Sequence, residues 1–201
     1  MSKSKTSNNA CPPPGLLLVL SAPSGAGKST VLRRLRALET NFGTTISATT
    51  RQPRPGEQHG RDYYFRDEAN FQTRRAAGDF VEWATVHGNY YGTLYSELDR
   101  CRSLGQDVLL EIDVQGMRLI REQCPDVITI FLMPPSLEEL ERRLRARGTD
   151  DEATIALRLK NAEQEMAAQN EYDHVVVNDN LDRAVAELRD ILWSSKVHFA
   201  Q

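Results

Sequence analysis

The feature that most constrains the fold of this chain is an uninterrupted apolar run followed at once by a glycine-rich loop. The run 16–20 shows no alternation of polar and apolar residues, which is typical of a strand buried on both faces of a parallel sheet. After the loop, Val31, Leu32, Leu35 and Leu38 recur at helical spacing, which indicates an amphipathic helix. A buried strand, a tight turn and a helix form half of a βαβ unit.

The loop itself carries a phosphate-binding pattern. It matches GxxxxGK[ST] except that Ala22 stands at the first glycine, where only a tight turn is required. Gly25 and Gly27 let backbone amides turn toward phosphate oxygens. Lys28 can reach the β and γ phosphates, and the Ser29 hydroxyl can bind Mg²⁺. An incidental lysine in a glycine-rich turn is the alternative, which the flanking strand and helix disfavour. The predicted phosphate-binding residues are Ala22, Pro23, Ser24, Gly25, Ala26, Gly27, Lys28, Ser29 and Thr30.

Further apolar runs predict more strands of the same sheet, at residues 107–113, 127–133 and 174–178. Helices are predicted at about 115–123 and over 181–197 from their apolar spacing. Strands that alternate with helices predict a doubly wound α/β core.

Two capping-box patterns occur in the stretch after the third of these strands. Ser136 with Glu139, and Thr149 with Glu152, predict the first turns of two helices that enclose an arginine-rich hinge. This helical segment interrupts the alternation of strands and helices in the core.

Composition places the chain among ordinary globular domains. It has 201 residues, 40% hydrophobic and 26% charged, which is room for one core with small additions. A net charge of −3 gives no general attraction to nucleic acid or to anionic membranes. Cys11, Cys101 and Cys124 form no CxxC pair, and the four histidines show no metal spacing. We therefore expect a cytoplasmic protein, with residues 1–14 as a disordered tail.

A phosphate loop alone does not name the reaction, because ATPases, switch GTPases and kinases all use one. The Asn-Lys-x-Asp sequence expected of a GTPase is not found in the chain. Residues 62–65 and 80–86 alternate in polarity and predict a small antiparallel insertion within 44–93. The residues of this insertion must therefore indicate which of these reactions the chain catalyses.

Several motifs in and after the insertion occur in one order. They are Thr-Thr-Arg-Gln-Pro-Arg-Pro-Gly-Glu at 49–57, Gly-Arg-Asp-Tyr-Tyr-Phe at 60–65, Glu-Trp at 82–83, Asn-Tyr-Tyr-Gly-Thr at 89–93, Glu-Ile-Asp-Val-Gln-Gly at 111–116 and Val-Val-Asn-Asp at 176–179. With the phosphate loop, they make the chain, from about residue 16 to its last helix, resemble guanylate kinases, the nucleoside monophosphate kinases that phosphorylate GMP from ATP.

The resemblance implies an architecture and a set of binding residues. The fold would be α/β, with a P-loop doubly wound parallel-sheet core, a small mixed β GMP-binding insertion and a helical lid. The implied segments are a core of residues 15–45, 97–136 and 171–201, a GMP-binding lobe of 46–96 and a lid of 137–170. The implied GMP-binding residues are Ser47, Arg51, Arg54, Tyr63, Glu82, Tyr91 and Thr93.

The chemistry of these residues suits a nucleotide acceptor. Arg51 and Arg54, stiffened by neighbouring prolines, can present two planar forks to one phosphate. Without the companion motifs, a solvated turn would be the better interpretation of both arginines. The Glu82 carboxylate can accept from the ring N–H and the amino group of guanine, a donor pair that adenine lacks. The alternative for Glu82 is an exposed strand position.

The remaining candidate residues concern the metal, the lid and the adenine. Glu111 and Asp113 end a strand where a carboxylate can face Mg²⁺ or the acceptor nucleotide, and Asp113 can also cap the next helix. The family's lid arginines match Arg147 and Arg158. Asn178 and Asp179, by resemblance, contact the adenine of ATP or else cap the last helix.

The resemblance implies a reaction in which Lys28, the four arginines and Mg²⁺ neutralise phosphate charge. ATP and GMP or dGMP would be the partners, and the chain would act as a monomer or weak homo-oligomer. Two alternatives stay open: a non-catalytic protein-interaction module of the same fold, and a kinase for another mononucleotide.

Overall fold

The protein folds around a five-stranded parallel sheet with strand order β2-β7-β1-β8-β9. The computed structural model describes residues 15–86, 88–146, 148 and 151–199. The core strands are β1 (Leu17–Ser21), β2 (Phe42–Gly43), β7 (Asp107–Glu111), β8 (Ile128–Met133) and β9 (His174–Val177). The core helices are α1 (Lys28–Leu38), α3 (Tyr95–Ser103), α4 (Val114–Gln123) and α7 (Leu181–Phe199), and a short 3₁₀ turn, η1 (Gln169–Glu171), precedes β9.

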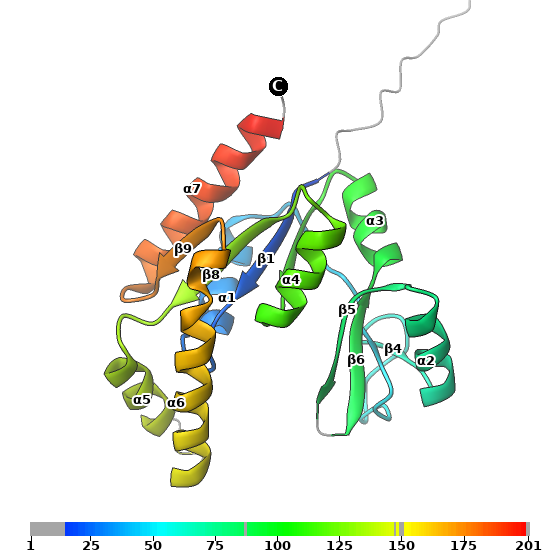
Figure 1. Ribbon diagram of the computed structural model, residues 1–201. Helices are drawn as coiled ribbons and strands as arrows, with labels where there is room; N and C mark the ends of the chain where they lie inside the picture. The colour runs from blue at the N-terminus through cyan, green and yellow to red at the C-terminus, as the bar shows by residue number, and fades with distance from the viewer. Residues whose placement is uncertain (1–14, 87, 147, 149–150, 200–201) are drawn as a thin grey trace, which may run out of the picture.

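Both faces of the central strand are buried, as its unbroken apolar run predicts. Leu18 and Leu20 of β1 pack in one cluster with residues of α1 and α7. Leu17 and Val19 pack in a second cluster with residues of α3 and α4. Successive side chains of a strand point to opposite faces, so a strand between two helical layers has to be apolar at every position. The predicted doubly wound α/β core is confirmed (Figure 1).

The inserted lobe, residues 46–96, carries a separate sheet with strand order β4-β3-β6-β5. Its β5–β6 and β3–β6 pairs are antiparallel, as predicted, whereas β3 and β4 pair in parallel. Phe71, Phe80, Ala48 and Leu94 form a small core of its own. The lobe elements are β3 (Ala48–Thr49), β4 (Tyr64–Phe65), α2 (Glu68–Ala76), β5 (Phe80–Val86) and β6 (Asn89–Leu94).

The segment predicted as a lid contains α5 (Leu137–Ala146) and α6 (Glu152–Ala167), which pack through Leu140, Leu144 and Ala162. The first predicted cap is confirmed, because the Glu139 amide donates to the Ser136 hydroxyl at 3.1 Å. The second was wrong. Helix α6 begins after Asp151, whose carboxylate accepts from the Thr154 amide at 2.7 Å. Thr149 lies outside the described residues.

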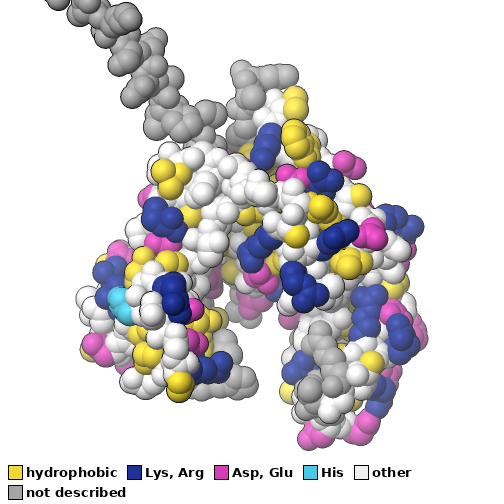
Figure 2. Space-filling model, turned by 180° about the vertical axis from the view of Figure 1, so that it is seen from behind, with side chains coloured by type: hydrophobic (Ala, Val, Ile, Leu, Met, Phe, Trp, Pro, Cys, Tyr) yellow, Lys and Arg dark blue, Asp and Glu magenta, His cyan; other side chains and the backbone are white. Residues whose placement is uncertain are grey.

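The lid and the inserted lobe extend from the same end of the core sheet, where β1 and its parallel neighbours finish (Figure 1). The space-filling view shows these two arms separated by a deep hollow (Figure 2). In a doubly wound sheet, ligands bind at the carboxyl ends of the strands, so the fold places a candidate site between the arms. Within the described part of the chain, no helix combines the length and apolar character needed to cross a membrane.

Candidate functional site

The glycine-rich loop between β1 and α1 has the backbone that phosphate binding requires. Gly25 and Gly27 have φ values of 101° and 94°, in the left-handed region that glycine adopts without strain. Helix α1 begins at Lys28 and has no acidic residue in its first turn, so its positive end is open to an anion. A cavity of about 370 Å³, the loop cavity, is lined by Ala22, Pro23, Ser24, Gly25, Gly27, Lys28, Ser29, Thr30 and Glu165.

The loop is held in place from β9 and from the lid. The side-chain amide of Asn178, which is buried, donates to the Ala26 carbonyl at 2.7 Å. Arg143 of α5 donates to the same carbonyl at 3.2 Å and to the Asn178 carbonyl at 2.9 Å. The predicted lid residue Arg158 donates to the Ser24 hydroxyl at 3.0 Å. Arg147, also predicted, lies outside the described residues.

Gly27 lacks space for any side chain. A Cβ atom there would lie 2.5 Å from the Nδ2 atom of Asn178, and its φ of 94° is strained for other residues. We expect Gly27→Ala to lose about 1–2 kcal/mol of stability and to weaken binding of ATP, the ligand that the sequence predicts for this loop, because Asn178 must leave the Ala26 carbonyl. Gly78→Ala is the matched control, since Gly78 has a φ of 76° and open space around it. Thermal unfolding and ATP titration of both variants test this, and equal ATP affinity in the two would contradict it.

A second cavity, the lobe cavity, lies between the inserted lobe and the core and measures about 380 Å³. Residues of β2, β7 and the segment after each form one wall, and β6 with Glu82 of β5 and Tyr63 forms the other. Arg36 of α1 also lines this cavity and pairs with Glu111 at 3.7 Å; sequence reasoning missed it because it reads as an exposed helix position. Six predicted residues are brought together here: Ser47, Tyr63, Glu82, Tyr91, Thr93 and Glu111.

Glu82 is the half-buried carboxylate of the lobe cavity. Its Oε1 atom accepts a hydrogen bond from the Thr93 hydroxyl at 2.8 Å across the β5–β6 pair. Burial raises the pKa of Glu82, an effect that hydrogen bonds from Thr93 oppose and the charge of Asp113 reinforces. An exposed strand position, the alternative for this residue, is therefore wrong. A carboxylate held in a cavity with one partner has spare acceptor capacity for a ligand.

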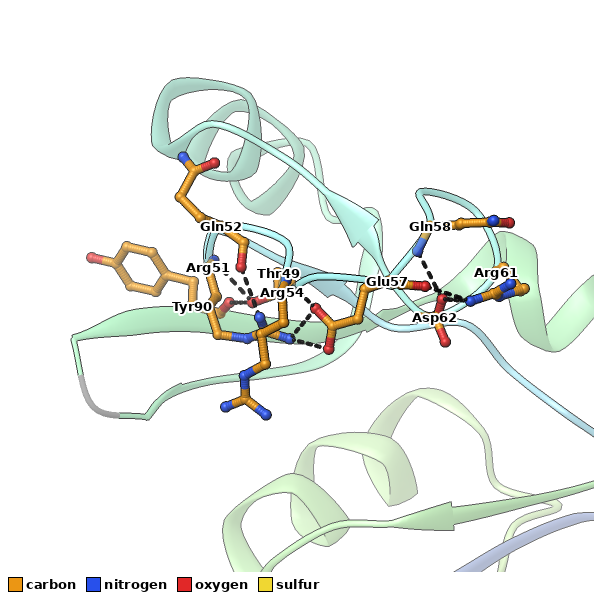
Figure 3. Close-up of polar contacts among 10 residues, drawn as sticks. Thr49, Arg51, Gln52, Arg54, Glu57, Gln58, Arg61, Asp62 and Tyr90 are labelled. Carbon is orange, nitrogen blue, oxygen red and sulfur yellow. Dashed lines mark hydrogen bonds and ion pairs between the residues drawn. The ribbon is translucent and has the colours of Figure 1, made fainter.

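Arg51 and Arg54 lie on the loop that follows β3, and the structure does not place them in the lining of the lobe cavity. Two hydrogen bonds, of 2.8 and 2.9 Å, join the guanidinium of Arg51 to the carboxylate of Glu57, and Figure 3 shows these groups facing each other. That guanidinium also lies 5.5 Å from the ring centre of Tyr63, a residue of the cavity wall. The Arg54 amide donates to Glu57 at 2.7 Å, while its side chain is exposed. Glu57 thus ties both arginines to one turn.

Asp113 caps α4, because its carboxylate accepts from the Gly116 amide at 2.8 Å. It also lines a cavity of about 520 Å³ together with Glu82 and Glu111, beside the lobe cavity. Its charge raises the pKa of Glu165, a residue of the loop cavity, although burial is the larger cause and Lys28 acts in the opposite direction. The carboxylates of Asp113 and Glu165 and the Ser29 hydroxyl are hard oxygen donors, which is the chemistry that Mg²⁺ takes.

Asn178 and Asp179 make different contacts. Asn178 serves the phosphate loop, as described above, while Asp179 is exposed and pairs with Arg183 of α7. The cap of α7 is instead Asn180, whose side chain accepts from the Arg183 amide at 3.1 Å. No contact of the Asn178 or Asp179 side chain within the described chain tests the predicted role toward adenine.

Known proteins share the sequence and the fold of this chain. Residues 15–195 match the family described as guanylate kinase. The guanylate kinase of Synechococcus sp. is 51% identical over 179 residues, covering 89% of this chain and 82% of that protein. That of Myxococcus xanthus is 49% identical, covering 94% of this chain and 90% of its own. The crystal structure of guanylate kinase from Anaplasma phagocytophilum superimposes with a TM-score of 0.66 at 36% identity, covering 90% and 86% of the two chains.

Proposed function

This chain belongs to the guanylate kinase family, and from this we infer that it transfers the γ-phosphoryl group of ATP to GMP, giving ADP and GDP. It is thus an ATP:GMP phosphotransferase, a nucleoside monophosphate kinase. The observation that carries the inference is the pairing of an intact phosphate loop with a separate cavity that contains the half-buried carboxylate of Glu82. A protein-interaction module would need neither feature, and nothing favours that alternative.

We propose that the loop cavity holds the phosphates of ATP. Backbone amides of residues 22–30 and the positive end of α1 would bind phosphate oxygens, and Lys28 would neutralise the β and γ phosphates. Arg158 supports this role because it already reaches Ser24 from the lid. Arg147 is proposed as the second lid arginine, and Asn178 with Asp179 as the contacts of adenine.

We propose that the lobe cavity holds GMP. Glu82 would accept from both guanine donors, while Thr93 holds its carboxylate and Ser47 adds a further polar contact. Tyr63 and Tyr91 would donate hydroxyl hydrogen bonds to the GMP phosphate, with Glu111 and Asp113 near the acceptor. Arg51 and Arg54 would bind the same phosphate, for which Arg51 would exchange its bonds to Glu57 for bonds to the nucleotide. Because dGMP carries the same base and phosphate, it is proposed as a second acceptor.

The proposed transfer needs no general base. The second pKa of a phosphate monoester is about 6, so the attacking oxygen of GMP is already ionised at neutral pH. The protein would align the two phosphates in line and neutralise their charge with Lys28 and the four arginines. Ser29 and, through water, Asp113 would hold Mg²⁺, which would supply positive charge to the phosphates.

Segment roles follow from the same proposal. The core would comprise residues 15–45, 97–136 and 171–201, the GMP-binding lobe residues 46–96 and the lid residues 137–170. Closure of the two arms over both nucleotides would assemble the arginines and exclude water from the γ-phosphoryl group. We also propose a cytoplasmic location, supported by the free thiols of Cys101 and Cys124, and a monomer or weak homo-oligomer, since one chain supplies both cavities.

The direct test is ADP formation from Mg-ATP with GMP, dGMP, AMP, UMP or no acceptor, run side by side. We expect turnover with GMP and dGMP only, because a purine lacking the guanine donor pair leaves Glu82 unpaired. ADP release without an acceptor would indicate an ATPase. Equal turnover with AMP would indicate another mononucleotide kinase, and GMP binding without turnover an interaction module.

A further inference from the structure

The junction between the core and the inserted lobe is built around the buried carboxylate of Glu97. This residue lies in the first turn of α3 and is only 3% exposed. The chain enters the lobe through residues 44–47 and leaves it through β6, which runs directly into α3. Glu97 therefore stands where the two connections of the lobe meet, a place at which burial of a charge needs a reason.

Hydrogen bonds of Glu97 close a ring that includes Ser47. Its Oε2 atom accepts from the Ile46 amide at 3.0 Å, and its Oε1 atom accepts from the Tyr64 hydroxyl at 2.9 Å. The Tyr64 amide in turn donates to the Ser47 carbonyl at 2.9 Å. Ser47 is thus held on one side through Ile46 and on the other through Tyr64, with both supports ending on the same carboxylate.

Arg100 compensates the charge and extends the ring to the entering connection. It donates to the two carboxylate oxygens of Glu97 at 3.3 and 2.9 Å, and to the Thr44 carbonyl at 2.8 Å. Burial alone would raise the pKa of Glu97, but the hydrogen bonds from Arg100, Ile46 and Tyr64 together lower it. Both oxygens consequently act as acceptors at neutral pH, which the ring requires.

The neighbours of this ring are cavity residues. Thr44 and Ser47 line the lobe cavity, and Tyr63, the residue before Tyr64, lines it as well. A shift of the entering connection or of β4 would therefore move the wall that faces the ligand, while the loop cavity takes no residue from the ring. A change in the ring should therefore alter binding in the lobe cavity and leave binding in the loop cavity unchanged.

We propose that Glu97 is a positioning residue for GMP, which holds Ser47 and the adjoining wall of the lobe cavity in the geometry that binds the nucleotide. The inference rests on the proposed function, because it takes GMP as the ligand of that cavity. Glu97 acts through Ser47 and Tyr64 and does not itself touch GMP.

The test uses two variants that each break the ring with little change in volume. Glu97→Gln replaces one acceptor by a donor, and Tyr64→Phe removes one donor. Calorimetric titration should show the Kd for GMP raised about tenfold in each, with the Kd for ATP changed less than twofold, since one hydrogen bond to a charged group is worth about this factor. Asp99→Asn, at an exposed position of the same helix, is the control and should leave both constants unchanged.

A cycle with Ser47→Ala separates positioning from mere stability. If Glu97 acts through Ser47, Glu97→Gln should raise the Kd for GMP less than threefold in the Ser47→Ala background, because coupled residues are not additive. Three outcomes would overturn this inference without affecting the proposed function. They are a full tenfold effect of Glu97→Gln in the Ser47→Ala background, an unchanged Kd for GMP in both ring variants, and equal losses of GMP and ATP binding. Failure of the wild-type chain to bind GMP would overturn the proposed function, and this inference with it.

Discussion

Replacing Lys28 with methionine is expected to lower kcat for GDP formation on the order of 10³-fold. Methionine keeps the length of the side chain but removes the positive charge from the loop cavity, where Lys28 lies at the start of α1. In phosphoryl transfer the protein contributes mainly alignment and charge neutralisation, and loss of one preorganised charge costs factors of this size. Steady-state kinetics with saturating Mg-ATP and GMP measure it.

The matched control for this variant is Lys160→Met, which removes the same charge from an exposed position on α6. It should keep turnover within twofold of the wild type. Titration with GMP adds a second check, because the lobe cavity does not include Lys28 and GMP affinity should survive the substitution. Turnover of Lys28→Met within tenfold of the wild type would contradict the proposed role of the loop.

Local patterns predicted those parts of the fold in which neighbouring residues act together. The apolar run of β1 predicts a buried strand and the glycine pattern after it predicts a tight turn, and the structure has both. Helix α2 was missed because Phe71 is its only buried residue, so it shows little apolar periodicity. The cap at Thr149 was wrong because Asp151, a strong cap residue nearer to the helix, competes for the same first turn.

Residues of the candidate site were likewise predictable where they belong to local motifs. Tyr63, Glu82 and Thr93 belong to compact motifs, and the structure gathers them in one cavity. Arg143 and Glu97, in contrast, lie on helices among many other charged residues, where most such side chains are exposed. Their hydrogen bonds reach the Ala26 carbonyl and the Ile46 amide, 117 and 51 residues away in the sequence. Only the tertiary fold brings these pairs together, so no local pattern could predict them.

Replacing Glu82 with glutamine is expected to abolish the preference for guanine. The amide keeps the shape of the side chain but presents a donor to one of the two guanine donors, so that two hydrogen atoms oppose each other. We expect the ratio of kcat/KM for GMP to that for AMP to fall on the order of 10³-fold. Parallel assays with the two acceptors measure this ratio. Glu68→Gln, exposed on α2 of the same lobe, is the control and should keep the wild-type ratio.

The same substitution should stabilise the free protein at neutral pH. Burial raises the pKa of Glu82 in the folded chain above its unfolded value, so the folded state holds this proton more tightly. Its contribution to the free energy of unfolding is therefore present below the unfolded pKa, about 4.3, and is lost as the pH rises through the raised folded value. Glutamine cannot ionise, so Glu82→Gln should unfold at a higher Tm than the wild type at pH 7. That gain should disappear at about pH 3.5, where both side chains are neutral.

These two expectations for Glu82 together distinguish a binding residue from a structural one. If the carboxylate served only to support the β5–β6 pair through Thr93, its replacement would destabilise the protein. The turnover of GMP and of AMP would then change alike. A carboxylate kept half-buried for a ligand costs stability in the free protein and returns it when guanine supplies the missing donors. A higher Tm at pH 7 with loss of guanine preference would therefore support the assignment. A lower Tm with an unchanged GMP to AMP ratio would contradict it.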